Sequence, residues 1–216
     1  MLEDDSVRKS PASLKHLAKV IGEESKRLRF QVEKVLQMSV YDNAGGSALK
    51  FTVVNVNNII YNIVNTQKIK AEKDGGSIDV ALDAIDADVR LDEMHFTNVI
   101  FNLLDNALKY MKEDTPPELK VSTRDIDHSR LEIRIRDNGI GLKKEDLKRI
   151  FEKFYRVSTG NRHDVKGFGL GLAYVKKMVS IFGGTITVES EFGKWSEFII
   201  HLPLADPDPD AESAGE

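Results

Sequence analysis

The sequence contains no cysteine in its 216 residues, which excludes disulfides and thiolate metal sites. It has no apolar run approaching the ~20 residues of a membrane span, and no apolar signal-peptide region at its N-terminus. Neither sign of charge dominates, because 31 Lys and Arg residues stand against 35 Asp and Glu residues. No basic block stands out, so nucleic acid is not an expected partner. These absences predict a soluble chain and fit a reducing compartment such as the cytoplasm.

Two common nucleotide-binding signatures are also missing. No stretch supplies the G-x-x-x-x-G-K-[ST] pattern of a P-loop. In KGFGLGLAYVKKM, residues 166 to 178, Gly167, Gly169 and Gly171 alternate, but Leu172 stands where a dinucleotide-binding fingerprint would need a further glycine. Glycines before a helix let backbone approach a phosphate closely, yet such a run can also be a plain turn. The spacing alone leaves both interpretations open.

The first 41 residues predict one long helix, over residues 11 to 41. Larger apolar residues alternate there with mostly small or polar ones, at alternating steps of four and three, as in a coiled-coil seam. The seam residues are Leu14, Ala18, Ile21, Ser25, Leu28, Val32, Val35 and Ser39. A lone helix with such a seam needs a partner. Residues 42 to 48 predict a linker, and the acidic, proline-containing residues 205 to 216 predict a disordered tail.

Residues 49 to 204 predict a single mixed domain. Strands are expected at 49–54, 77–82, 89–91, 118–125, 131–136, 185–190 and 195–202. Helices are expected at 56–73, from a cap at Asp92 to about residue 111, at 144–151, and from about 170 to 182. The last two strands form a closing hairpin. The expected fold class is therefore α+β.

Three further stretches give the glycine run a context. In NVIFNLLDNALKY, residues 98 to 110, Asn98, Asn102, Asn106 and Lys109 share one helix face opposite an apolar stripe. Asparagine forms helices poorly, so three in register favour a ligand-facing role over a solvated surface. RDNGIG, residues 136 to 141, allows two interpretations. It is an ordinary turn, or it places the Asp137 carboxylate at a strand end beside glycines that let a planar ligand lie against the backbone. In IFEKFYR, residues 150 to 156, the aromatics suit a core and the charges suit a surface, unless a triphosphate lies nearby.

In this order, the four stretches closely resemble the N, G1, F and G2 boxes of the catalytic domain of sensor histidine kinases, and the resemblance covers residues 49 to 203. It implies a two-layer α/β sandwich of the Bergerat type, shared with gyrase and heat-shock protein 90, preceded by one long helix. It also implies that ATP and Mg²⁺ bind between the N-box helix, the G1 turn and a lid at residues 152 to 167.

The resemblance carries over a role for each matching residue. Asp137 should accept a hydrogen bond from the adenine amino group, Tyr110 should pack against the base, and Asn106 should hold Mg²⁺. The catalytic residues implied are Asn102, Lys109 and Arg156. The full set expected at the nucleotide is Asn102, Asn106, Lys109, Tyr110, Asp137, Gly139, Gly141, Arg156, Gly167, Gly169, Leu170 and Gly171. The backbone of Gly169, Leu170 and Gly171 should cradle phosphate at a helix N-terminus.

Asn102 separates the alternatives within this fold. ATP-hydrolysing relatives carry a glutamate four residues before the metal-binding asparagine, whereas Asn102 is an amide and cannot act as a general base. This favours a kinase over an ATPase, and the intact ligand-type residues argue against a scaffold that merely holds nucleotide.

The first 41 residues resemble the second helix of the family's dimerisation and phosphotransfer hairpin. The acceptor motif, of the form His-Glu-x-x-Thr-Pro, is absent, and His16 has no neighbouring acid. We therefore expect a truncated chain that does not phosphorylate itself. Its parent would be a homodimeric inner-membrane sensor that holds this part on the cytoplasmic side and acts on a response regulator.

Overall fold

The computed structural model describes residues 14, 17–18, 21–22, 49–157 and 169–205. The chain divides into two compact units, Met1–Ser47 and Ala48–Glu216. The described residues of the first unit are helical, and both Leu14 and Ile21 are exposed there. Most of the helix predicted for 11–41, all of the predicted linker, most of the predicted lid, the predicted tail except Ala205, and Gly167 lie outside the described residues. The predicted domain boundaries therefore stay a prediction.

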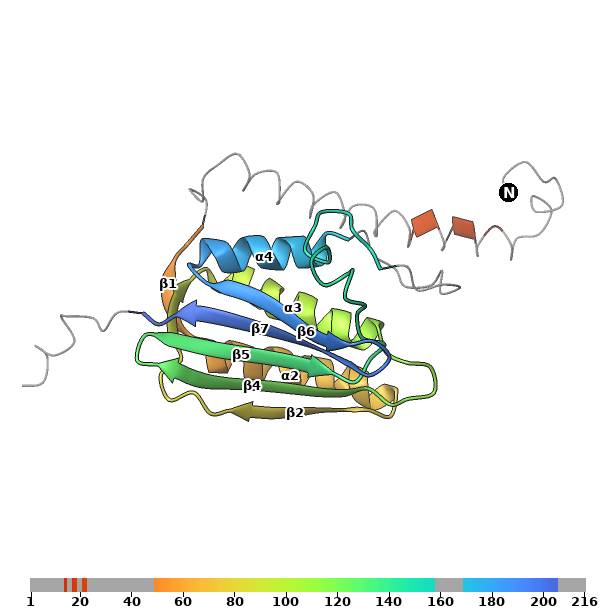
Figure 1. Ribbon diagram of the computed structural model, residues 1–216, viewed down its shortest axis with the longest axis horizontal. Coiled ribbons are helices and arrows are strands. Elements are labelled where there is room, and N and C mark those ends of the chain that lie inside the picture. Colours follow the sequence, from red (N-terminus) through yellow and green to blue (C-terminus); the bar gives the residue numbers. More distant parts are fainter. Residues whose placement is uncertain (1–13, 15–16, 19–20, 23–48, 158–168, 206–216) are drawn as a thin grey trace, which may run out of the picture. The chain divides into compact units, whose positions relative to one another are not determined.

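The second unit contains two β-sheets and three helices in its described part (Figure 1). In chain order, the elements are β1 (Thr52–Asn55), α2 (Val56–Lys73), β2 (Ser77–Leu82), β3 (Asp88–Leu91), α3 (Glu93–Lys109), β4 (Glu118–Asp127), β5 (Arg130–Asp137), α4 (Gly171–Ile181), β6 (Thr185–Glu191) and β7 (Trp195–Pro203). The large sheet has the order β2-β4-β5-β7-β6, parallel between β2 and β4 and antiparallel elsewhere, and β1 pairs with β3.

The three helices cover one face of the large sheet, which gives two layers (Figure 1). Along β5, Leu131, Ile133 and Ile135 alternate with polar residues and are fully buried. Phe96 and Leu103 of α3 are also fully buried. A strand places alternate side chains on opposite faces, so the period-two pattern supplies the apolar face on which the helices pack. The predicted α+β sandwich is confirmed.

The start of α3 is fixed by a side-chain cap. Asp92 accepts the backbone N–H of His95 at 3.0 Å, as its place before the apolar run predicts. Its other carboxylate oxygen accepts the N–H of Lys50 at 2.9 Å. Asp92 therefore ties the start of the second unit to the helix that carries the predicted N-box residues.

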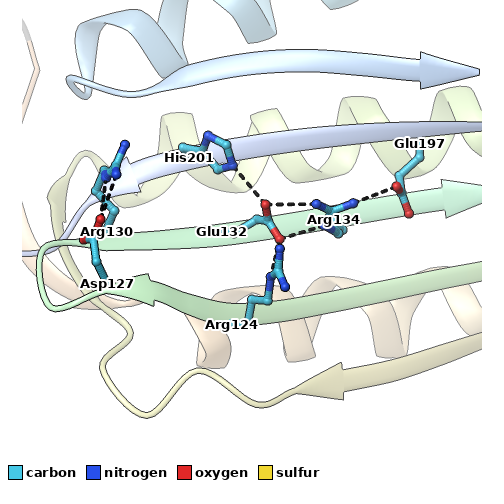
Figure 2. A network of polar contacts seen from close by, with 7 residues as sticks. All are labelled: Arg124, Asp127, Arg130, Glu132, Arg134, Glu197 and His201. Atoms are coloured by element: carbon cyan, nitrogen blue, oxygen red, sulfur yellow. Dashed lines mark hydrogen bonds and ion pairs between the residues drawn. The ribbon is translucent and has the colours of Figure 1, made fainter.

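The opposite face of the sheet carries a network of charged side chains (Figure 2). The buried carboxylate of Glu132 accepts hydrogen bonds from Arg124 at 2.5 Å and from Arg134 at 2.7 Å, and lies 3.0 Å from His201. Arg134 also bonds Glu197 at 2.9 Å. The hydrogen bond from Arg134 is the largest of several effects that together lower the pKa of Glu132 to about 2. Adjacent strands β4, β5 and β7 are thereby tied together on this face.

One predicted element differs. The helix expected at 144–151 is instead a run of turns. The Lys143 carbonyl accepts the N–H groups of Asp146 and Leu147, and the Asp146 carbonyl accepts those of Arg149 and Ile150, so bonds across three and four residues are mixed. The bonds across four residues come from Leu147 and Ile150 and are not successive, whereas a continued α-helix needs one from each successive residue.

Candidate functional site

A cavity of about 80 Å³ opens between α3, the end of β5 and the start of α4. Its walls come from segments far apart in the sequence. The lining residues are Asn106, Ala107, Tyr110, Asp137, Ile140, Gly141, Leu142, Ile150, Tyr155, Arg156, Val157, Leu172, Ser196 and Phe198. Most of these side chains are apolar, with a few polar groups, which is the usual make-up of a small-molecule site.

Asp137 is the buried carboxylate of this cavity and stands at the end of β5. It is only 7% exposed and accepts the Gly139 N–H at 2.8 Å. Burial raises its pKa to about 6, against the lowering effect of the N–H groups of Gly139 and Ser196 and of nearby positive charges. Near neutral pH it is therefore an ionised hydrogen-bond acceptor in a largely apolar wall.

The turn after β5 requires two of its glycines. A Cβ on Gly139 would lie 2.5 Å from the Tyr110 carbonyl oxygen. A Cβ on Gly141 would lie 2.2 Å from the Glu191 carbonyl oxygen, and its φ of +65° is one that side chains rarely adopt. The turn is also bonded to its surroundings, since the Ile140 N–H donates to Tyr110 and the Gly193 N–H donates to Ile140. This wall of the cavity is therefore held in place by backbone.

The polar residues of α3 have different surroundings. Asn106 lines the cavity. Asn102 is buried and donates its Nδ2 to the Asn98 carbonyl at 2.6 Å, and a Cβ on Gly171 would lie 3.1 Å from its Oδ1. Lys109 forms an ion pair with Asp105 and does not line the cavity.

Asp105 is the partner of two lysines. Burial opposes its ionisation, but hydrogen bonds from Lys109 and Lys70 outweigh this effect and lower its pKa. Lys70 Nζ lies 3.0 Å from Asp105 and joins α2 to α3. The predicted reach of Lys109 to the phosphates would therefore require it to exchange this carboxylate for a phosphate.

Arg156 lies at the cavity beside Tyr155. The Tyr155 hydroxyl donates to the buried carboxylate of Asp146 at 2.5 Å, and the Arg149 guanidinium lies 4.2 Å from the Tyr155 ring centroid. Burial raises the pKa of Tyr110, and the positive charge of Arg156 opposes that rise. Tyr110 and Arg156, which are 46 positions apart in the sequence, thus meet at one cavity.

The structure gathers five of the predicted residues at this cavity: Asn106, Tyr110, Asp137, Gly141 and Arg156. Gly139 bonds Asp137 directly. Lys109, Asn102, Gly169, Leu170 and Gly171 do not line the cavity, although Gly171 abuts Asn102. The roles of all these residues, at the cavity or away from it, remain predictions.

Sequence reasoning missed Tyr155 and Ser196 as cavity residues. Ser196 could have been found, because it shares the alternation of Phe198 and Ile200 on β7 and so faces the helices.

A mixed sheet covered by helices, with a buried carboxylate at a strand end facing an asparagine-bearing helix, defines the class of ATP-binding domains that the motifs indicated. A sequence profile of the family described as histidine kinase-, DNA gyrase B-, and HSP90-like ATPase matches residues 91–206. The chain belongs to this family.

Curated relatives narrow the class further. The chain is 52% identical over 204 residues to the sensor protein RprX of Bacteroides fragilis (strain YCH46), covering 94% of the chain and 39% of that protein. It is 34% identical over 196 residues to the sensor protein kinase WalK of Staphylococcus saprophyticus (strain ATCC 15305), covering 89% of the chain and 32% of that protein. The chain thus corresponds to the ATP-binding catalytic region of sensor histidine kinases and spans less than half the length of these relatives.

Solved structures agree on the fold. Full-length ShkA in complex with AMPPNP superposes with a TM-score of 0.76 at 22% identity, over 90% of this chain and 40% of that one. The catalytic domain of the histidine kinase ThkA gives 0.62 at 24% identity, over 72% and 96%. ThkA in complex with the response regulator protein TrrA gives 0.69 at 22% identity, over 91% and 53%. Within the described residues, no helix has both the length and the apolar character needed to cross a membrane.

Proposed function

We propose that this chain binds Mg²⁺-ATP and donates the γ-phosphate to a histidine on a dimerisation helix, as the catalytic part of a two-component sensor. The observation that carries the proposal is the cavity of the second unit, where the Asp137 carboxylate and the Asn106 amide line the same space. The Asp137 carboxylate suits the amino group of a base, and the Asn106 amide suits a metal ion bound to phosphate.

The apolar lining supports a planar base as the ligand of the inner cavity. Ile140, Leu142 and Phe198 offer apolar surface, Tyr110 offers a ring, and Asp137 offers the one carboxylate. An exocyclic amine donates N–H groups, and an ionised carboxylate can only accept them. Adenine therefore fits this end better than a base with an oxygen at the same position.

Asn106 suits Mg²⁺ because this ion prefers oxygen ligands and keeps water and phosphate in its coordination shell. When bound, the metal would neutralise part of the triphosphate charge. Arg156 supplies positive charge at the cavity, and Lys109, one turn from Asn106, would add to it only on exchanging Asp105 for a phosphate. Phosphoryl transfer depends chiefly on positioning and charge neutralisation, which this arrangement would provide.

Asn102 favours transfer over hydrolysis. It stands four residues before Asn106, is an amide, and donates its Nδ2 to a helix carbonyl. Such a group cannot take a proton from water. An ATPase of the same fold, or a nucleotide-holding scaffold, is the alternative. None of the five histidines lies in a His-Glu-x-x-Thr-Pro motif, so we propose that the acceptor histidine lies on another segment or chain.

In the whole protein, we propose a homodimeric membrane sensor that holds this part in the cytoplasm and passes phosphate to a response regulator. The coiled-coil seam of the first 41 residues, with Leu14 and Ile21 exposed, supports a partner helix.

Calorimetry with a non-hydrolysable ATP analogue, with and without Mg²⁺, tests the binding step. We expect Mg²⁺-dependent binding that Asn106→Ala weakens about tenfold or more, since the metal loses a protein ligand. Asn65→Ala, an exposed asparagine on α2, is the matched control and should leave affinity unchanged. Equal affinity for Asn106→Ala and the unaltered chain would show that Asn106 is not the metal ligand.

Incubation with γ-labelled ATP and Mg²⁺ tests the transfer step. We expect no acid-labile label on this chain alone, slow release of phosphate, and label on an added helix fragment that carries the acceptor histidine. Stoichiometric label on His16 would refute the proposed acceptor, and rapid hydrolysis would favour the ATPase.

A further inference from the structure

A row of three polar side chains crosses three neighbouring strands at the cavity. Asp137 on β5 pairs in register with Ser196 on β7, and Ser196 pairs in register with Ser190 on β6. Side chains of directly opposed residues on adjacent antiparallel strands lie on the same face of the sheet. Asp137 and Ser196 line the cavity, so the row extends from the cavity toward the hairpin between β6 and β7.

The hydroxyl of Ser190 has its full set of hydrogen bonds. It donates to the Trp195 carbonyl oxygen at 2.7 Å and accepts the Leu142 N–H at 2.8 Å. Its oxygen also lies 3.3 Å from the Ser196 hydroxyl oxygen. A serine hydroxyl has one proton and two lone pairs. Because that proton is directed at Trp195, the contact between the two serines is a donation from Ser196 to Ser190.

The direction of this bond decides what Ser196 can offer a ligand. With its proton directed at Ser190, the Ser196 oxygen has only lone pairs left for the cavity. The ionised carboxylate of Asp137 is also only an acceptor. The row therefore presents two acceptors, side by side on adjacent strands.

We propose that Ser190 is a positioning residue for base specificity: by holding Ser196 as an acceptor, it makes the cavity favour a purine with an amino group at C6 over one with an oxo group. The inference rests on the proposed binding of ATP. An exocyclic amine has two N–H groups for two acceptors, directly or through a water molecule, whereas a 6-oxo group would face oxygen atoms that cannot donate to it.

Calorimetric titration of the full chain with Mg²⁺-ATP and Mg²⁺-ITP tests this role, because the two nucleotides differ only in the 6-amino and 6-oxo groups and the accompanying N1 proton. In Ser190→Ala, the Ser196 hydroxyl is free to turn and donate into the cavity. We expect the preference for ATP over ITP to fall about fivefold, the equivalent of one ordinary hydrogen bond. Ser190→Thr keeps a hydroxyl and should keep the preference. Thr187→Ala, exposed on β6 with its side chain on the opposite face, should also keep it.

The ratio of the affinities for ATP and ITP distinguishes the proposed role of Ser190 from a purely structural one. Loss of the acceptor for Leu142 would lower thermal stability and weaken ATP and ITP alike, which leaves their ratio unchanged. In a Ser196→Ala background, Ser190→Ala should produce no further change in the ratio. An unchanged ratio in Ser190→Ala, or an equal further loss in the Ser196→Ala background, would overturn the inference.

Two further outcomes are separated by design. If Ser190→Ala does not fold, Ser196→Ala tests the acceptor on which the inference depends. It should reduce the preference for ATP, and an unchanged preference overturns the inference. Failure of the proposed function is seen earlier, as absence of ATP binding by the unaltered chain. ATP binding with no effect of these serines on the ratio would leave the proposed function standing and remove the role of Ser190.

Discussion

Replacement of Asp137 by asparagine should stabilise the protein while removing its nucleotide binding. Asparagine has nearly the same shape and keeps an oxygen for the Gly139 N–H, but it carries no charge to bury. The pKa of Asp137 is about 6 in the folded protein, against an ordinary value of 3.8. That difference corresponds to about 3 kcal/mol lost from the free energy of unfolding once both states are ionised. We expect Asp137→Asn to recover much of this at neutral pH.

The pH dependence gives the sharper test. Because the folded protein holds the Asp137 proton to a higher pH than the unfolded chain, this group's stabilisation is complete below pH 3.8 and is lost as the pH rises through 6. The advantage of Asp137→Asn in urea unfolding should therefore grow by about 2 kcal/mol between about pH 4.5 and about pH 7.5. Asp79→Asn, exposed on β2, controls for a general effect of net charge.

Ionisation of Asp137, which lowers the stability of the folded protein, should raise its affinity for ATP. ATP affinity of the unaltered chain should fall below pH 6 by up to about tenfold per pH unit, since the amino group needs an ionised acceptor. Affinity of Asp137→Asn should be low at every pH. A pH-independent stability difference, or tight ATP binding by the variant, would refute the reasoning.

Three further changes test the packing around the site, each measured by urea unfolding. Gly141→Ala combines a strained φ with a carbonyl oxygen 2.2 Å from the new Cβ, and should lower the free energy of unfolding by about 3 kcal/mol. Gly193→Ala has a similar φ but open space around the Cβ, and should lower it by about 1 kcal/mol. Equal losses would contradict the close approach at Gly141. Glu132→Gln should lower the free energy of unfolding by about 2 kcal/mol near neutral pH. The loss should shrink as the pH falls below about 4, because the fold stabilises only the ionised form of Glu132, as its lowered pKa shows. Glu189→Gln, exposed on the same face, should change the stability little. Asp92→Ala should cost about 1 to 2 kcal/mol, since two backbone N–H groups lose their acceptor, and no loss would show that Asp92 does not cap α3.

Much of the fold follows from local patterns in the sequence. The helix predicted at residues 56 to 73 coincides with α2, and Asp92 caps α3 as its position before an apolar run requires. The strands were found because their side chains alternate and turn residues separate them. These signals lie within a few residues of one another, so no knowledge of the rest of the chain is needed to read them. The expected helix at 144–151 was wrong because its apolar spacing could not show that the bonds across four residues would be interrupted rather than successive.

The sequence alone also determined the class of the protein, since four motifs in order identified the domain. It predicted as one set Asn106, Tyr110, Asp137, Gly141 and Arg156, which line one cavity, and their roles at a nucleotide stay a prediction. Only the tertiary structure decided what these residues touch. The pairing of Lys109 with Asp105 has a helical spacing, but its competition with a ligand depends on where the cavity lies. The row from Asp137 through Ser196 to Ser190 depends on strand register across more than 50 residues of sequence. A hydroxyl's direction is set by all its neighbours at once, and those neighbours come from segments that meet only when the sheet forms.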